Sequence, residues 1–88
     1  MANYKIEISA SAEKYIKKIP KKDLAKVIKA IQILGINPYP EGCRKLQGHE
    51  DVYRVRQGNY RIIYEVEDKK LIILVLKIGH RKDIYKKG

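Results

Sequence analysis

Residues 3–8 alternate polar and apolar side chains, the pattern of a β-strand with one buried face. Apolar residues then recur at helical spacing, at Ala12, Tyr15, Ile16 and Ile19. Ser9 or Ser11 can cap this helix, and Pro20 ends it or opens the next one. A second helical stripe follows, formed by Leu24, Val27, Ile28, Ile31 and Leu34. The first half of the chain therefore predicts a strand and then a helical hairpin that packs on a sheet.

The second half changes to the periodicity of strands. Residues 52–56 and 60–66 are separated by Gln57-Gly58-Asn59, which predicts a β-hairpin. Residues 71–78 contain a continuous apolar run, typical of a strand covered on both faces. The order β-α-α-β-β-β predicts a single α+β domain over residues 1–88. In it, the N-terminal helical hairpin packs on a mostly antiparallel, four-stranded twisted sheet, and a basic tail covers residues 79–88.

Composition points to an anionic partner. The formal net charge is +10 and the pI is about 9.8, which favours nucleic acid ahead of a membrane surface. The single cysteine, Cys43, excludes an intrachain disulfide and fits a reducing cytoplasm. The longest uninterrupted apolar stretch is residues 71–76, so neither secretion nor membrane spanning is expected. We expect a soluble cytoplasmic protein.

The basic residues divide by type along the chain. Every basic residue before position 44 is a lysine, whereas the second half holds Arg44, Arg54, Arg56, Arg61 and Arg81. Arginine carries a rigid fork of donors that matches phosphate geometry, and lysine is a mobile point charge that also serves solubility alone. Arg54 and Arg56 stand two apart in a predicted strand and therefore share a face. With the helices on the other face, they and Arg61 are expected to form a basic trough.

The candidate chemistry is metal-free cleavage of RNA. His49 and His80 are far apart and no carboxylate pair accompanies them, so no metal site is expected. Nucleotide-binding glycine loops are absent, and no cofactor is expected. RNA supplies its own nucleophile, the ribose 2′-hydroxyl, and needs from a protein a base, an acid and cations that stabilise the phosphorane. His80 or Tyr85 are candidates for the proton transfers, because nearby arginines lower the pKa of a tyrosine.

Four segments carry a resemblance that covers nearly the whole chain. They are Lys45-Leu46-Gln47-Gly48, Val52-Tyr53-Arg54-Val55-Arg56, Gly58-Asn59-Tyr60-Arg61-Ile62-Ile63-Tyr64, and Val75 through Gly79-His80-Arg81 followed by Tyr85. On these residues and the element order, the chain resembles the RelE/ParE toxin superfamily, most closely its RelE-like messenger-RNA interferases. The resemblance implies a cytoplasmic toxin that enters the ribosomal A site and cleaves messenger RNA by 2′-hydroxyl attack, without a metal. It also implies neutralisation by a small cognate antitoxin similar to RelB.

The resemblance assigns roles to individual residues. Arg61 corresponds to the arginine that stabilises the phosphorane, Arg81 to the one near the leaving group, and Tyr85 to a C-terminal tyrosine proposed as the base. The gap between Arg81 and Tyr85 is shorter than in the best-known bacterial member, which makes His80 a rival base. Contacts to the RNA backbone are expected from Arg54, Arg56, Arg44 and Lys45.

Two other functions fit parts of this pattern. The ParE branch shares the fold but inhibits DNA gyrase by binding, without nuclease activity. A plain RNA-binding module is the third reading, although such modules present exposed aromatic platforms and most tyrosines here fit core or edge positions. The joint presence of the arginines and Tyr85 favours the interferase.

Overall fold

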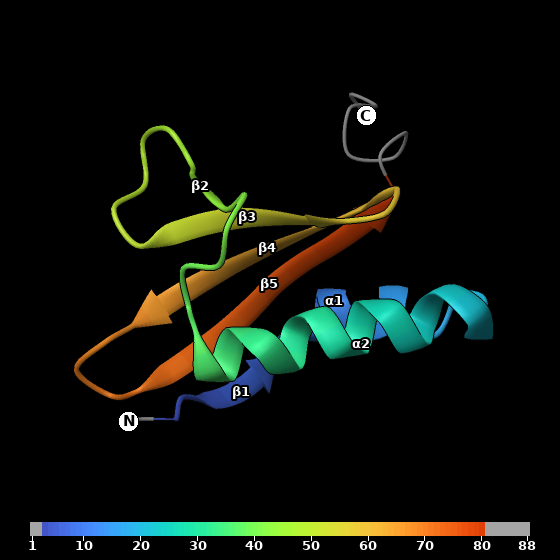
Figure 1. Ribbon diagram of the computed structural model, residues 1–88, viewed down its shortest axis with the longest axis horizontal. Helices are drawn as coiled ribbons and strands as arrows, with labels where there is room; N and C mark the ends of the chain where they lie inside the picture. Colours follow the sequence, from blue (N-terminus) through green and yellow to red (C-terminus); the bar gives the residue numbers. More distant parts are fainter. Residues whose placement is uncertain (1–2, 81–88) are drawn as a thin grey trace.

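A computed structural model describes residues 3–80, so Arg81 and Tyr85 lie outside the described part of the chain. Two helices and five strands make up the domain (Figure 1). In chain order they are β1 (Lys5–Ile8), α1 (Ala10–Ile16), α2 (Lys21–Ile36), β2 (Arg44–Lys45), β3 (Val52–Gln57), β4 (Tyr60–Glu67) and β5 (Ile72–His80). No helix among the described residues is long and apolar enough to cross a membrane.

The strands form one mixed sheet in the order β1-β5-β4-β3-β2. β1 runs parallel to β5, and every other neighbouring pair is antiparallel. The predicted element order and α+β class are confirmed, but the sheet has one strand more than expected. The extra strand, β2, consists of Arg44 and Lys45 at the sheet edge. Two residues are too few to show a period of two in the sequence, which is why β2 was not predicted.

Both helices lie on the same side of the sheet (Figure 1). Ser9 caps α1, where its hydroxyl accepts a hydrogen bond of 3.1 Å from the Ala12 backbone N–H. Pro20 precedes the first turn of α2, where its missing N–H is no loss. The core between the layers joins helix residues to alternate sheet residues: Ala12, Val27, Ile31, Leu34, Ile62, Tyr64, Ile73 and Val75 are all buried. The helical stripes and the strand alternation read from the sequence therefore meet in one core.

Gly35 allows α2 to lie close to β1. The Tyr4 backbone N–H donates to the Gly35 carbonyl at 2.7 Å, and a Cβ on Gly35 would lie 3.0 Å from the Tyr4 carbonyl oxygen. Gly35 is thus a close-approach residue inside the helix, which continues to Ile36.

A bulge in β5 changes which side chains face the helices. Ile63 pairs with Lys77, and the next residue, Tyr64, pairs with Val75, so Leu76 is left without a partner on β4. Before the bulge, Val75 faces the helices; after it, Ile78 does. After the bulge, each side chain of β5 therefore lies on the face of the sheet opposite to the one that strict alternation would give it.

Candidate functional site

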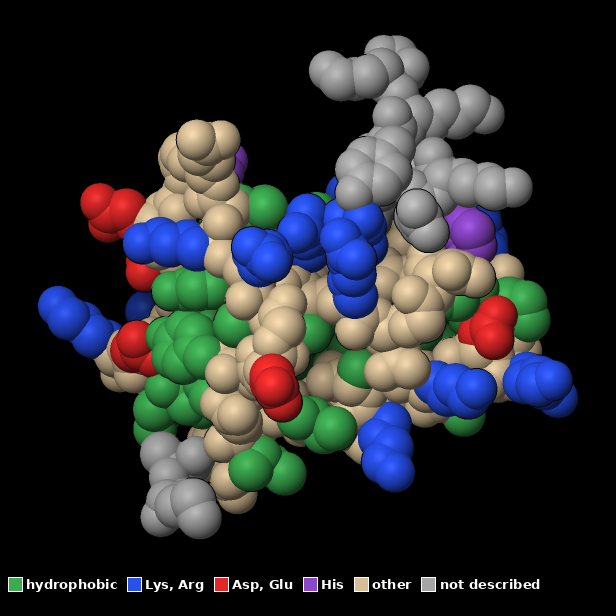
Figure 2. Space-filling model, turned by 45° about the horizontal axis from the view of Figure 1, so that its top comes forward, with side chains coloured by type: hydrophobic (Ala, Val, Ile, Leu, Met, Phe, Trp, Pro, Cys, Tyr) green, Lys and Arg blue, Asp and Glu red, His purple; other side chains and the backbone are tan. Residues whose placement is uncertain are grey.

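The strand register places four arginines on the face of the sheet opposite the helices. Arg44 pairs with Arg54, and Arg56 pairs with Arg61. Directly opposed residues of antiparallel strands project to the same side, and residues two apart in a strand do so as well. Arg44, Arg54, Arg56 and Arg61 are called the arginine face below. In Figure 2 basic side chains gather in the upper middle of the surface, while acidic ones lie scattered around it.

Arg61 differs from its neighbours in burial. Its side chain is only 3% exposed and is the one buried polar or charged side chain within residues 3–80, whereas Arg56 is exposed. Burying a charged side chain costs free energy unless its surroundings compensate, so a buried guanidinium is held in a defined place. It lies in β4 between the core residues Tyr60 and Ile62, which anchor the backbone on both sides. The strand therefore presents Arg61 as a fixed cation.

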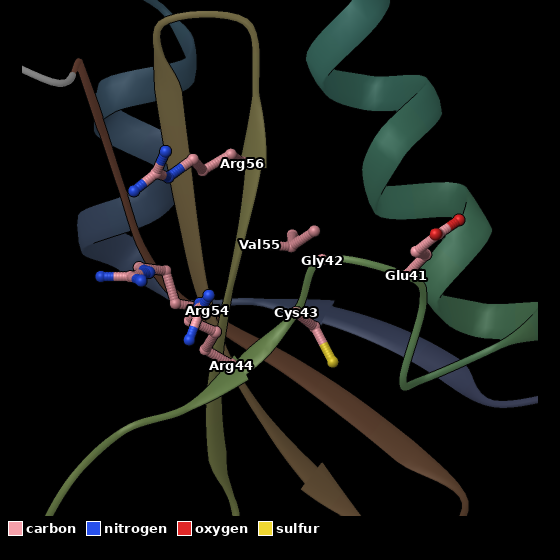
Figure 3. Close-up of a pocket in the computed structure, with 7 residues that line it drawn as sticks. All are labelled: Glu41, Gly42, Cys43, Arg44, Arg54, Val55 and Arg56. Carbon is pink, nitrogen blue, oxygen red and sulfur yellow. The ribbon is translucent and has the colours of Figure 1, made fainter.

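A cavity of about 510 Å³ adjoins the other three arginines. It is lined by Arg44, Arg54 and Arg56 and by the loop at Glu41, Gly42 and Cys43. Figure 3 shows Arg54 and Arg56 directed to one side of the β3–β4 pair and Val55 to the other. A second hollow, of about 50 Å³, touches Arg56, Arg61 and the turn at Gly58 and Asn59. Arg56 lines both hollows, so the cationic surface is continuous from the sheet edge to Arg61.

His80 lies on the helix side of the sheet. It pairs with Tyr60, and the two rings meet edge to face with centroids 5.4 Å apart. Its backbone N–H donates to the Tyr15 hydroxyl oxygen at 2.8 Å. On the opposite face, Gly79 is the residue paired with Arg61. The bulge at Leu76 causes this arrangement, which does not bring the His80 imidazole together with the arginine face.

Lys45 is also on the helix side, because it pairs with Tyr53, whose ring packs on Tyr64 with centroids 6.0 Å apart. The structure thus separates Lys45 from Arg44, its neighbour in the chain. Of the predicted site residues, Arg44, Arg54, Arg56 and Arg61 come together. Arg81 and Tyr85 lie outside the described residues, and their roles stay predictions.

Tyr60 connects the site strand to α2 through Asp23, a contact that the sequence did not reveal. The Tyr60 hydroxyl donates to Asp23 Oδ2 at 3.1 Å. Burial, followed by this hydrogen bond, raises the pKa of Tyr60 above its ordinary value, so its hydroxyl remains a donor at neutral pH. An acidic residue in the first turn of a helix is also expected from the helix dipole alone, so its sequence position gave no signal of this contact.

The other tyrosines of the helix side build a structural cluster. Tyr39 and Tyr53 meet edge to face at 5.1 Å, and the Tyr64 hydroxyl donates to the Pro38 carbonyl at 2.7 Å. Burial and the nearby Asp68 raise the pKa of Tyr39 to about 12. These rings fasten the loop between α2 and β2 to the sheet and lie away from the arginine face.

Within residues 3–80, no three side chains of His, Cys, Asp or Glu come close enough together to hold a metal ion. Cys43 is half-buried beside Tyr64, and His49 is exposed in the loop before β3. On the face of the sheet opposite the helices, the ionisable groups that the register brings together are the arginines of the arginine face.

Comparison with known proteins shows the family to which the chain belongs. A family model described as the ParE toxin of type II toxin–antitoxin systems matches residues 6–85. The RelE1 protein of Methanocaldococcus jannaschii is 35% identical, over 94% of this chain and 96% of its own length. The mRNA interferase toxin RelE of Escherichia coli is 36% identical over a shorter stretch, 46% of this chain and 44% of its own.

A solved structure extends the likeness to three dimensions. The RelE–RelB complex of Pyrococcus horikoshii contains a chain that superimposes with a TM-score of 0.80 at 32% identity. The match covers 90% of this chain and 96% of that one. The protein belongs to the RelE/ParE superfamily, the toxins of type II toxin–antitoxin systems.

Proposed function

We propose that this toxin is a messenger-RNA endoribonuclease that works on the ribosome and cleaves the message by 2′-hydroxyl attack. The observation that carries the proposal is the arginine face, with the buried Arg61 beside the exposed Arg56 on the side of the sheet opposite α1 and α2. A phosphorane carries more negative charge than the phosphodiester from which it forms. A cation that is held in place before the reaction stabilises that added charge without reorganising.

We assign the arginines different roles according to their exposure. Arg61 is the group assigned to the phosphorane oxygens, because the core holds its backbone on both sides. Arg54 and Arg56, which line the larger cavity, bind the phosphates that flank the cleaved bond. Arg44 extends this surface at the sheet edge through its pairing with Arg54. The mechanism asks for no metal, since these cations take the role that a metal ion has in other nucleases.

Proton transfer is assigned to Tyr85, with Arg81 beside the leaving 5′ oxygen. Both assignments come from the resemblance and concern residues outside the described range. The position of His80 supports them, because its ring packs on Tyr60 at the helix side and is turned from Arg61. A phenol near several guanidinium groups has a lowered pKa, which lets it accept the 2′ proton. We therefore assign His80 a structural role, in which its ring packs against Tyr60.

A cognate antitoxin similar to RelB is the proposed protein partner. The P. horikoshii relative was solved as a RelE–RelB complex, and it superimposes over most of this chain. A partner that neutralises the toxin has to cover or displace the arginine face, so acidic side chains are expected where it lies. The ribosomal A site, with its message, is the proposed target, and we place the toxin in the cytoplasm.

A second candidate is inhibition of DNA gyrase without nuclease activity, as in the ParE branch. The family model that matches residues 6–85 carries the ParE name, which is the observation in its favour. A binding inhibitor does not need a buried arginine beside exposed ones on a cationic face. The arginine face therefore favours the nuclease.

One experiment separates the two candidates. The toxin is induced in growing cells, and primer extension maps the ends of ribosome-bound messages while plasmid supercoiling is measured in parallel. New message ends within codons, absent for Arg61→Ala, are the expected result. Loss of supercoiling with intact messages would establish the gyrase inhibitor instead.

A further inference from the structure

A hollow of about 180 Å³ lies on the helix side of the turn between β3 and β4. The side chains that matter for its chemistry are Asp23, Lys26, Asn59, Tyr60 and His80. The hollow shares Gly58, Asn59 and Tyr60 with the small hollow beside Arg56 and Arg61. The exposed turn at Gly58 and Asn59 therefore borders both hollows, and Gly58 has no side chain there.

The hollow contains a fixed carboxylate in a strongly basic chain. Tyr60 donates to Asp23 Oδ2 at 3.1 Å, which orients the group. A carboxylate has about four lone-pair sites, so this one bond leaves Asp23 able to accept others. An ionised carboxylate only accepts hydrogen bonds, and a phosphodiester has no donor to offer it, so Asp23 suits a ligand that carries N–H groups. The exposed Lys26 at the same hollow is a cation that can contact a phosphate outside it.

Size and chemistry together define the ligand class. A cavity of about 180 Å³ is smaller than the range of about 300 to 1,000 Å³ that holds drug-sized ligands, so it suits a single base. Guanine, adenine and cytosine each carry an exocyclic amino group that donates hydrogen bonds, and uracil does not. Uracil donates only through its ring N3–H, so an acceptor-only carboxylate finds more donors on the amino bases. Asn59 adds an amide that both donates and accepts.

We infer that this hollow receives the base of the message nucleotide next to the cleaved phosphate, and that Asp23 selects a base with an amino group. The inference rests on the proposed function, because it takes the phosphate at Arg61 as its starting point. It adds a reading of the base, whereas the arginine face contacts the backbone alone. Tyr60 is the positioning residue, since its hydroxyl holds the Asp23 carboxylate.

The test uses ribosomes programmed with four messages that differ only in the base next to the cleavage site. Cleavage rates are measured for the wild-type toxin, Asp23→Asn and Tyr60→Phe, with Lys22→Gln as the matched control. Lys22 is an exposed residue of the same helix turn and does not line the hollow. Circular dichroism and thermal melting show whether each variant is folded.

The wild type is expected to cleave the three amino-base messages at least about tenfold faster than the uracil message. Asp23→Asn and Tyr60→Phe are expected to reduce that ratio toward one, and Lys22→Gln to leave it unchanged. An unchanged ratio in a folded Asp23→Asn protein overturns the base site. An equal loss of rate on all four messages also overturns it, and assigns Asp23 to the support of β4. Absence of cleavage by the wild type on every message overturns the proposed nuclease itself.

Discussion

The two faces of β4 have opposite properties, although their residues alternate along one strand. Toward the helices, Tyr60, Ile62 and Tyr64 are buried in the core. Toward the open side, Arg61 pairs with Arg56 and joins the arginine face. In the segment Tyr60-Arg61-Ile62-Ile63-Tyr64, most residues thus build the fold, and one residue is assigned to the chemistry. A sequence motif that identifies a family can therefore consist mainly of core residues.

The largest expected effect is on the helix side. Tyr64→Ala removes a fully buried ring that stacks on Tyr53, and we expect it to lower the free energy of unfolding by about 3 to 5 kcal/mol. Tyr64→Phe keeps the ring and loses the hydrogen bond to the Pro38 carbonyl, for a loss of about 1 kcal/mol. Urea denaturation measures both. Equal losses for the two variants would show that the ring does not support the core.

On the arginine face, we expect a substitution to reduce the rate of message cleavage and not the stability of the protein. Arg61→Ala removes the fixed cation, and we expect message cleavage to fall about 10²- to 10³-fold while the protein stays folded. Arg61→Lys keeps the charge but loses the fork of donors, and should recover only part of the rate. Single-turnover cleavage on programmed ribosomes gives the rates. A folded Arg61→Ala toxin with wild-type rates would remove Arg61 from the mechanism.

A smaller effect is expected on the salt dependence of RNA binding, where removing one positive charge from each face compares the two faces. Arg56→Ala removes a cation from the arginine face, and Lys45→Ala removes one from the helix side. For single-stranded RNA, each lost phosphate contact is expected to reduce the slope of log affinity against log salt by about 0.7. Arg56→Ala should show this change and Lys45→Ala should not. An equal change of slope in both variants would show that the arginine face is not the surface that binds the RNA phosphates.

The smallest effect is the alkaline behaviour of the tyrosine cluster. The pKa of Tyr39 is raised from 10.0 to about 12, first by burial and then by Asp68. A raised pKa means that the folded state favours the neutral phenol, so this stabilisation is complete below pH 10 and is lost as the pH rises toward 12. Ultraviolet titration should show the Tyr39 transition shifting toward 10.0 in Asp68→Asn. An unshifted transition would mean that Asp68 does not act on Tyr39.

Much of the fold could be predicted because its signals are local. Alternation in residues 3–8 and 60–66 and the helical stripes through Val27 and Ile31 identified the elements. The buried side was also identified for 60–66 and the helices, whereas Ile8 of the first strand is exposed. The pairing of Arg54 and Arg56 on one face also follows from the strand period alone. The local pattern does not show which strands lie next to each other in the sheet. The parallel pairing of β1 with β5, for example, depends on contacts between distant segments.

The site was predictable in part for the same reason. The arginines of β3 and β4 could be placed from periodicity, whereas the side on which His80 lies depends on the bulge at Leu76. Strict alternation from Val75 would turn His80 toward the arginine face, and one unpaired residue reverses that. The contact between Asp23 and Tyr60 joins residues far apart in the chain and has no sequence spacing that announces it. Bulges and long-range hydrogen bonds thus limited the prediction of the site.

The most direct test of the central claim is the cleavage of a message bound to purified ribosomes by the wild-type toxin, Arg61→Ala and Lys45→Ala. The two variants lose one positive charge each, on opposite faces of the sheet. The arginine face predicts product ends within the A-site codon for the wild type and Lys45→Ala, and almost none for Arg61→Ala. Equal cleavage by the two variants, or none by the wild type, would contradict the assignment of the arginine face as the site of RNA cleavage.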